Sequence, residues 1–381
     1  MIHRIRVQNF KSIVDVTVEL SEVVVLVGRS GTGKSNFIQS LRLLRDMLSW
    51  GQMQVVQQQQ QWANIRPAFG SDSPLSFDVE FSIAGIDERF NYSLTLPPQL
   101  GQMPSEERLV LGGQPLFHQG GGGPRGQAKW VVEPATVPAI QPGGIALGRI
   151  PSISEVVIAF SALTSGIGCY AFSDKVLCAG AQQQVTPTGL DDNGINYLGV
   201  LKEIASNLQD LTVRKSIVGA LQRVNPSVSS VELDSIQQPQ HAVVGHKFNG
   251  KVLALDLAQE SDGFRRFYAH LLALYQRPPK QTLLFEHPED GIHPGALSLL
   301  AEEFKAAPQD GRGQVILSTH SPQLLDEFDA EQIRVVELDG LKTRIGSVSN
   351  EQKEAIREKL LDLGELLTAD PARMQKEATG S

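Results

Sequence analysis

The sequence is poor in cysteine, in long apolar runs and in net positive charge, and each shortage excludes a class of protein. Its 381 residues include two cysteines, Cys169 and Cys178, which argues against a disulfide scaffold and fits a reducing compartment. No apolar stretch reaches the roughly 20 residues that a membrane-spanning helix needs. Residues 1–4 lead into a strand pattern and not into a signal peptide. The formal net charge of −8 gives no global attraction to nucleic acid. We therefore expect a soluble, cytoplasmic protein without a membrane partner.

A glycine-rich segment at residues 28–35 carries the strongest functional signal. It reads Gly-Arg-Ser-Gly-Thr-Gly-Lys-Ser, the full P-loop pattern for nucleoside triphosphates. Its glycines let consecutive backbone N–H groups face phosphate oxygens. Lys34 would reach the β- and γ-phosphates, and the Ser35 hydroxyl would ligate Mg²⁺. An apolar strand at 23–27 precedes it, and helical spacing over 37–48 follows, which places a helix N-terminus under the phosphates. We predict that ATP and Mg²⁺ bind here, and the expected nucleotide-binding residues are Gly28, Arg29, Ser30, Gly31, Thr32, Gly33, Lys34, Ser35 and Asn36.

The first 225 residues contain segments that differ in their pattern of apolar, glycine and proline residues. Residues 2–20 alternate in polarity as two strands joined by a turn, and residues 77–96 alternate as an antiparallel hairpin. The glutamine-rich run at 51–61 predicts a solvated loop or helix end. Glycine and proline punctuate residues 97–151 so heavily that long heptad helices are excluded there. Helical spacing returns over 155–225, so we expect a flexible insertion followed by a helical lobe.

Three further motifs follow in the second half of the chain. Ser261-Asp262-Gly263 precedes a helical run, which would place a hydroxyl, free N–H groups and a positive dipole end at one helix N-terminus. Taken alone, such a triplet is more often an ordinary N-cap. The apolar strand at 282–285 ends in Glu286, the arrangement of a carboxylate that holds Mg²⁺ directly or through water. A further strand at 314–318 leads to His320.

The order of these motifs resembles a known family. A strand, then Asn9-Phe10-Lys11-Ser12, a second strand and a P-loop ending Gly-Lys-Ser-Asn is similar to the opening of the SMC-like and RecF-like ATPases of the ABC class. With the Ser-Asp-Gly signature and Thr-His-Ser at 319–321, nearly the whole chain resembles the OLD-like (overcoming lysogenization defect), SMC-related ATPases. The resemblance implies that Glu286 holds Mg²⁺ and that His320 points at the γ-phosphate. It also implies that Ser261, Asp262 and Gly263 meet a γ-phosphate bound to the opposite subunit.

His287 departs from the family pattern. It stands where the family usually carries its catalytic glutamate, which implies slow hydrolysis with binding retained. A zinc site made by His287, Glu289 and His293 is an alternative, but no cysteine lies nearby and the P-loop context explains these residues better. The expected catalytic residues are Glu286, His287, His320 and Lys34.

The resemblance implies an α/β fold, an ABC-class P-loop ATPase head with a mixed sheet, an antiparallel β-subdomain and an inserted helical lobe. We expect the N-terminal part of the ATPase at 1–100. A flexible segment and the helical lobe are expected at 101–245, the rest of the ATPase core at 246–349, and a C-terminal helix at 350–381.

Three classes of function compete. Because signature and P-loop serve opposite subunits in this class, the resemblance implies a homodimer or higher homo-oligomer in which two chains enclose two ATP molecules. The first candidate is a sensor or scaffold ATPase of a bacterial anti-phage defence system that controls a separate nuclease or toxin. The effector is expected to be separate because the short tail after the last strand has no room for the Toprim nuclease domain of OLD-type nucleases. The second is a RecF-like DNA-repair ATPase that clamps DNA directly, and it leaves a DNA contact open. The third, a transporter's nucleotide-binding domain, is disfavoured because the Leu-Ser-Gly-Gly signature is missing.

Overall fold

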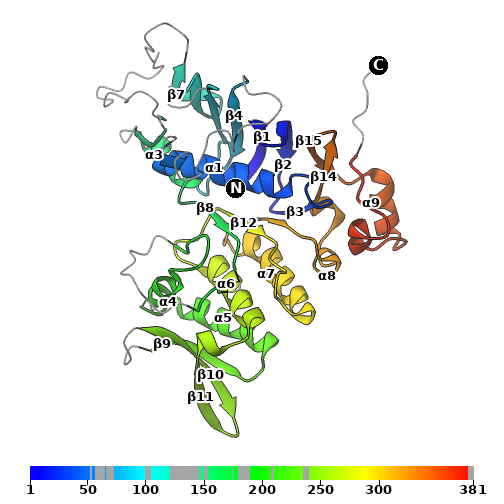
Figure 1. Ribbon diagram of the computed structural model, residues 1–381. Helices are drawn as coiled ribbons and strands as arrows, with labels where there is room; N and C mark the ends of the chain where they lie inside the picture. The colour runs from blue at the N-terminus through cyan, green and yellow to red at the C-terminus, as the bar shows by residue number, and fades with distance from the viewer. Residues whose placement is uncertain are drawn as a thin grey trace. The chain divides into compact units, whose positions relative to one another are not determined.

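The computed structural model places most of the chain in two units that interleave along the sequence (Figure 1). It describes residues 1–51, 54–55, 65, 73–98, 104–120, 145, 147–149, 153–173, 175–178, 189–206, 210–234 and 240–375. Unit 1 comprises Met1–Ile167, Glu331–Leu360 and Pro371–Ser381, and unit 2 comprises Gly168–Ala330 and Leu361–Asp370. The four-part division expected from the sequence stays a prediction.

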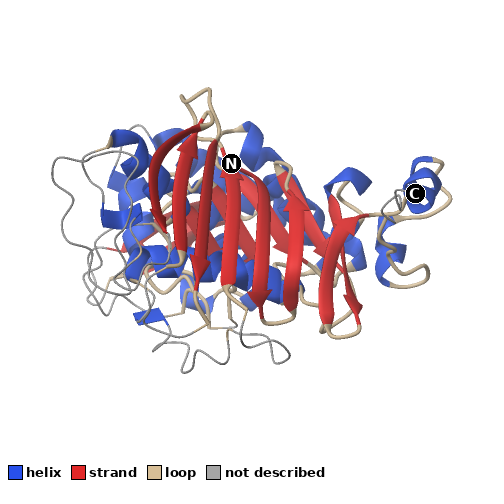
Figure 2. Cartoon of the chain, turned by 90° about the horizontal axis from the view of Figure 1, so that it is seen from above, coloured by secondary structure: helices blue, strands red, loops and turns tan. Residues whose placement is uncertain are grey.

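Unit 1 is built on a six-stranded antiparallel sheet in the order β2-β1-β4-β5-β6-β7, whose strands lie side by side in Figure 2. The strands are β1 (Ile2–Phe10), β2 (Ile13–Glu19), β4 (Leu75–Phe81), β5 (Phe90–Leu96), β6 (Glu106–Leu111) and β7 (Gln114–Gly120). Every second residue of β4 and β5 is buried, as expected for a sheet with one face on a core. Phe81 stands opposite Phe90, and their rings stack at 5.2 Å. The predicted antiparallel subdomain is confirmed.

A second set of strands in unit 1 carries the P-loop. All five residues of β3 (Val23–Val27) are buried, as in a strand covered on both faces. It pairs in parallel with β14 (Ile333–Asp339), which turns back antiparallel into β15 (Lys342–Ser347). Helix α1 (Lys34–Trp50) begins after the P-loop and buries Phe37, Leu41, Leu44 and Leu48. The other helices of unit 1 in the described ranges are η2 (Leu147–Arg149), α3 (Ser154–Leu163) and α9 (Asn350–Arg357).

Unit 2 combines a buried parallel pair of strands with helices. β12 (Thr282–Glu286) lies between β13 (Gln314–Ser318) and β8 (Ile167–Tyr170), and β12 and β13 run parallel with Glu286 opposite Ser318. Neighbouring helices α6 and α7 are drawn in yellow in Figure 1. The helices of unit 2 among the described residues are α4 (Tyr197–Ser206), α5 (Leu211–Val224), η4 (Leu257–Gln259), α6 (Asp262–Tyr275), η5 (Pro294–Ala296), α7 (Leu297–Gln309), α8 (Pro322–Leu325) and η7 (Leu363–Leu367). In the sequence, η6 (Ala330–Gln332) spans the boundary at which unit 2 ends and unit 1 resumes.

Two expectations need correction. The inserted region is not only helical, because β9 (Val228–Asp234), β10 (His241–Phe248) and β11 (Lys251–Asp256) form an antiparallel sheet. Its outer strand β11 is open on both faces and shows no alternation of burial, so periodicity did not indicate it. The tail is not one helix either: α9 ends at Arg357, Lys359 takes a left-handed φ of 59°, and the chain restarts as η7.

Three further features noted in the sequence are the glutamine run, the two cysteines and the lack of long apolar stretches. The glutamine run at 51–61 falls almost entirely outside the described residues, so the expectation for it stays a prediction. Cys169 is buried and Cys178 exposed, and both are free thiols. Within the part of the chain that the structure describes, no helix combines the length and the apolar character needed to cross a bilayer.

Candidate functional site

The P-loop forms a closed cradle between β3 and α1. The side chain of Lys34 is buried, and its Nζ donates to the carbonyl oxygens of Gly28 at 2.6 Å and Arg29 at 3.1 Å. The ammonium group therefore lies inside the loop that it belongs to. Arg29, Ser30 and Gly31 line the open rim, since all three are half-buried or exposed. An ammonium group inside a glycine-rich loop at a helix N-terminus fits a phosphate chain.

Gly33 has a steric reason to be glycine. Its φ is 109°, a value that L side chains rarely adopt. A Cβ at this position would stand 2.1 Å from Thr343 Oγ1. That hydroxyl instead donates to the carbonyl of Thr32 at 2.8 Å, so the start of β15 supports the P-loop from behind. The sequence did not indicate Thr343, because no local signal marks a contact made from 311 residues away.

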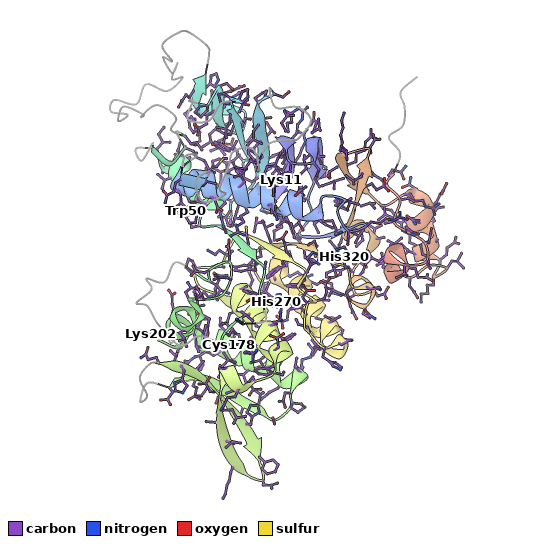
Figure 3. The ribbon with its side chains drawn as sticks, viewed as in Figure 1. Lys11, Trp50, Cys178, Lys202, His270 and His320 are labelled. Carbon is purple, nitrogen blue, oxygen red and sulfur yellow. The ribbon has the colours of Figure 1, made fainter. Side chains whose placement is uncertain are left out.

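The Asn-Phe-Lys-Ser turn braces the same loop. Asn36 Nδ2 donates to Ser12 Oγ at 2.7 Å, and Ser12 Oγ lies 2.7 Å from Thr343 Oγ1. Lys11, labelled in Figure 3, donates to Gln39 Oε1 on α1 at 2.5 Å. Residues of the turn thus fix both the first turn of α1 and the strand behind the P-loop.

The signature triplet caps a long helix in unit 2. Ser261 is exposed and is the N-cap of α6, and its Oγ accepts from the backbone N–H of Phe264 at 3.2 Å. Asp262 and Gly263 form the first turn, and the carboxylate of Asp262 accepts from Arg266 Nε at 2.9 Å. Arg266 also donates to the carbonyl of Phe172 at 2.7 Å. The helix N-terminus is therefore preformed, with the hydroxyl and free N–H groups that an anion requires.

The acid and the two histidines meet at the carboxyl ends of β12 and β13. His287 follows Glu286 with a left-handed φ of 48°, and its N–H donates to the carbonyl of Ser318 at 3.1 Å. The rings of His287 and His320 stack with centroids 4.9 Å apart; His320 is labelled in Figure 3. The predicted residues Glu286, His287 and His320 are thus neighbours in unit 2.

Glu289, which the sequence indicated only as a ligand of the alternative zinc site, organises this cluster. Its Oε1 accepts from the backbone N–H of His320 at 2.7 Å and lies 3.8 Å from His287 Nδ1. Interaction with the Glu289 carboxylate raises the pKa of His287, and the charges of Asp290 and Glu286 act in the same direction. Burial would raise the pKa of Glu289, but the interactions with His287 and the His320 backbone outweigh it and lower that pKa.

Unpaired oxygens in this cluster fit a hydrated Mg²⁺. Among the described residues, Glu286 Oε1, Glu289 Oε2 and Ser318 Oγ are buried without a hydrogen-bond partner, a state that costs free energy unless water or a cation meets them. No three His, Cys, Asp or Glu side chains in the described ranges are placed to hold a metal, so the zinc alternative is not supported. Mg²⁺ typically takes one or two carboxylates together with substrate phosphates and water. Ser35 belongs to unit 1 and Glu286 to unit 2.

The acidic stretch 326–329 has a structural explanation. Asp326 Oδ1 accepts from the backbone N–H of Gly364 at 2.5 Å, which ties α8 to η7. The contact gives Asp326 a packing role.

Two family models match separate parts of the chain. One, described as an AAA ATPase domain, matches residues 1–108. The other, described as an AAA domain, putative AbiEii toxin, Type IV TA system, matches residues 194–326. No curated protein matches the chain.

Solved structures of SMC heads share the fold. The Smc head bound to the C-winged helix domain of ScpA is 13% identical, with a TM-score of 0.57 over 92% of this chain and 99% of that one. The Pyrococcus furiosus Smc head with an extended coiled coil, bound to the C-terminal domain of ScpA, is 13% identical, with a TM-score of 0.54 over 94% and 99%. The Pyrococcus yayanosii head with a coiled coil and joint is 12% identical, with a TM-score of 0.52 over 94% and 99%. The fold is that of an SMC-type head, and the two AAA matches fall within it.

Proposed function

We propose that this AAA ATPase of SMC-like type is an ATP-driven homodimeric switch, OLD-like in character, which controls a separate nuclease or toxin effector in bacterial anti-phage defence. The observation that carries the switch is that one chain holds both a closed P-loop cradle and an exposed, preformed signature helix end. The match of residues 194–326 to a model described by a toxin–antitoxin system supports the defence role. The free thiols of Cys169 and Cys178 are in keeping with the cytoplasm.

The P-loop residues bind and orient the phosphates in this proposal. Lys34 places its ammonium group against the β- and γ-phosphates in place of the two carbonyls that it now contacts. Backbone N–H groups from Gly28 to Asn36 complete the cradle. Ser35 and Glu286 would hold Mg²⁺, which when bound supplies positive charge against the phosphate oxygens.

The unit 2 residues act on the γ-phosphate and on the attacking water. Glu289 accepts a hydrogen bond from the backbone N–H of His320, and the exposed ring of His320 stacks on His287. His287 takes the place of a general base, and its left-handed backbone aims it at the same strand ends. Ser261, Asp262 and Gly263 would meet the γ-phosphate of the opposite subunit, so two chains enclose two ATP molecules. Hydrolysis is expected to be slow, so the ATP-bound dimer is long-lived.

Nucleotide-dependent assembly tests the proposal. The full chain with ATP and Mg²⁺ should double its mass in light scattering and release phosphate slowly. Lys34→Ala should lose both properties, and Ser261→Arg should lose assembly. Ser206→Arg, at an exposed serine on α4, is the matched control and should assemble normally. A monomer under all conditions, or full assembly of Ser261→Arg, contradicts the switch, whereas an ATP-dependent shift of duplex DNA would favour the RecF-like clamp.

A further inference from the structure

The β10–β11 hairpin of unit 2 presents apolar side chains to solvent. Its strands turn at Asn249-Gly250, and around this turn Phe248 is 70% exposed, Val252 64% and Leu253 56%. Figure 1 shows the hairpin at the lower end of unit 2. Because successive side chains of a strand alternate between faces, Phe248 and Leu253 share one face of the hairpin and Val252 lies on the other. Exposed apolar surface beyond scattered single residues marks an interaction site.

The outer strand of this hairpin is an open edge. β11 is the outermost strand in the order β11-β10-β9, and residues 251–254 are exposed on both of its faces. Phe248 pairs with Lys251 across a two-residue turn, so alternation of the ladder leaves the backbone N–H and C=O groups of Val252 and Ala254 facing outward. Edge strands are usually protected by charge, proline or a cover. Residues 252–255 have neither charge nor proline, so this edge can accept another strand.

The charge around the edge indicates the chemistry of the added strand. Residues 245–254 contain Lys247 and Lys251 and no acidic residue. Across the described ranges, no salt bridge involves either ammonium group. A second copy of β11 would fit less well: symmetric pairing through Val252 and Ala254 puts Leu253 opposite itself and Lys251 opposite Leu255, and the Asp256 carboxylate that ends β11 falls opposite Gly250 and not opposite a lysine. An apolar strand flanked by acidic residues would pair with the outward backbone groups of β11 and would bring carboxylates to Lys247 and Lys251.

The same hairpin is hydrogen-bonded to the turn that precedes the signature residue Ser261. His246 stands directly across from Leu253, and a register shift between Gly245 and His246 re-aims it relative to β9. Its Nε2 hydrogen-bonds Glu260 Oε1 at 2.7 Å, and its Nδ1 hydrogen-bonds Ser227 Oγ at 2.8 Å. Glu260 immediately precedes Ser261. A strand that shifts β11 therefore acts, through the His246–Glu260 hydrogen bond, on the turn that starts α6.

We propose that β11 is the docking edge for an extended, apolar segment with acidic flanks from a separate protein, and that His246 is a positioning residue that transmits docking to Ser261. The docking part of the proposal depends only on the exposure, edge position and charge of the β10–β11 hairpin. The transmission part rests on the proposed function, because it assigns the signature serine to the ATP-bound dimer. Such an edge gives the switch a surface on which its effector is held or released.

A peptide probe tests the docking. A capped, labelled heptapeptide of alternating valine and threonine with aspartate and glutamate ends should bind the full chain, and its lysine-ended counterpart about tenfold more weakly. Ala254→Pro removes an outward N–H that β10 does not use, so it should abolish binding without unfolding the sheet. Leu360→Lys alters a leucine that is 75% exposed in unit 1 and should bind as wild type. Equal binding of both peptides, or binding unaffected by Ala254→Pro, overturns the proposal.

Hydrolysis by the same proteins tests the transmission. The acidic peptide should change the ATP turnover of the wild type about twofold or more. His246→Leu should still bind the peptide but lose the change, and His246→Gln, which retains a donor for Glu260, should recover part of it. An unchanged response in His246→Leu overturns the coupling. Peptide binding by a chain that does not hydrolyse ATP contradicts the proposed function while leaving the docking edge in place.

Two further outcomes overturn the docking proposal in favour of another occupant. Duplex DNA that binds in place of the peptide, and that is lost in Lys247→Ala with Lys251→Ala, would assign the hairpin to nucleic acid. Self-association without nucleotide that Leu253→Lys abolishes would assign it to a second copy of the chain.

Discussion

The imidazole rings of His287 and His320 stack with centroids 4.9 Å apart and planes only 10° from parallel. One carboxylate serves both residues: Glu289 bonds the backbone of His320 and lies beside the Nδ1 atom of His287. The ring proposed to replace a glutamate base is therefore held on one side by a second ring and on its edge by an acid. This arrangement restricts the freedom of His287 to follow an attacking water.

His287 should limit the rate of hydrolysis. General-base assistance is typically worth about 10²–10⁴-fold, and a stacked imidazole beside a carboxylate replaces it poorly. We expect His287→Glu to hydrolyse ATP faster than wild type in single-turnover assays, and His287→Ala to differ little from wild type. A fast wild type that His287→Ala cripples would show instead that the histidine is a full substitute base. Nucleotide affinity should be similar in all three proteins.

Alanine substitutions at Gly33 and Gly31 separate the effect of steric overlap on ATP binding from the effect of backbone strain. Both take left-handed φ values, 109° and 81°, but a Cβ on Gly31 meets no atom within 4 Å, whereas on Gly33 it overlaps the Thr343 side chain. Left-handed strain costs roughly 1–2 kcal/mol in either variant. We expect Gly33→Ala to lose about tenfold or more in ATP affinity relative to Gly31→Ala, measured with a fluorescent nucleotide. Equal affinities would contradict the role of Thr343 as the support of the loop.

The sequence predicted those parts of the site that are local. The P-loop, the strand before it and the helix after it are contiguous, so spacing alone placed Lys34 and Ser35 correctly on these elements. Ser261 was predicted at a helix start and is found there as the N-cap. The supports were missed because they depend on chain packing: Thr343 reaches Gly33, and Glu289 reaches His320, from distant positions that no pattern connects.

The sequence failed where burial does not alternate. β11 is open on both faces, so it lacks the period of two that indicated β4 and β5. The tail was predicted as one helix because its apolar spacing continues past Lys359, whose left-handed φ breaks the hydrogen-bond ladder. Periodicity reports which face is buried and cannot report a local backbone turn.

Acid should destabilise unit 2 through His270, which is labelled in Figure 3. Burial, helped by the charge of Arg266, lowers the pKa of His270 to about 4, although its hydrogen bond to the Arg266 carbonyl and the charge of Glu289 oppose the shift. Its ring packs against Phe172, Phe285 and Phe304. Since the unfolded chain binds the proton near the ordinary pKa of 6.5, this contribution to stability is intact above pH 6.5 and falls as the pH drops toward 4.

The loss should be on the order of 3 kcal/mol at pH 4, by linkage of the two pKa values. Urea unfolding of the full chain between pH 7.5 and 4 measures it. His270→Phe, which fills the same aromatic site without titrating, should flatten this part of the pH dependence, whereas His118→Phe on the unit 1 sheet should leave it unchanged. An unaltered pH profile in His270→Phe would show that other groups govern acid unfolding.

Ser261 has two separable roles, as the N-cap of α6 and as the proposed contact to a γ-phosphate on the opposite subunit. Asparagine and aspartate both cap helices about as well as serine, so Ser261→Asn and Ser261→Asp should each keep the thermal stability of the wild type to within about 0.5 kcal/mol. They differ by one negative charge at the exposed end of the helix. Against a phosphate that charge is repulsive, so Ser261→Asp should lose ATP-dependent dimerisation in light scattering while Ser261→Asn retains most of it. The two variants share size, cap and fold, so dimers of equal strength from both would mean that no phosphate meets this helix end.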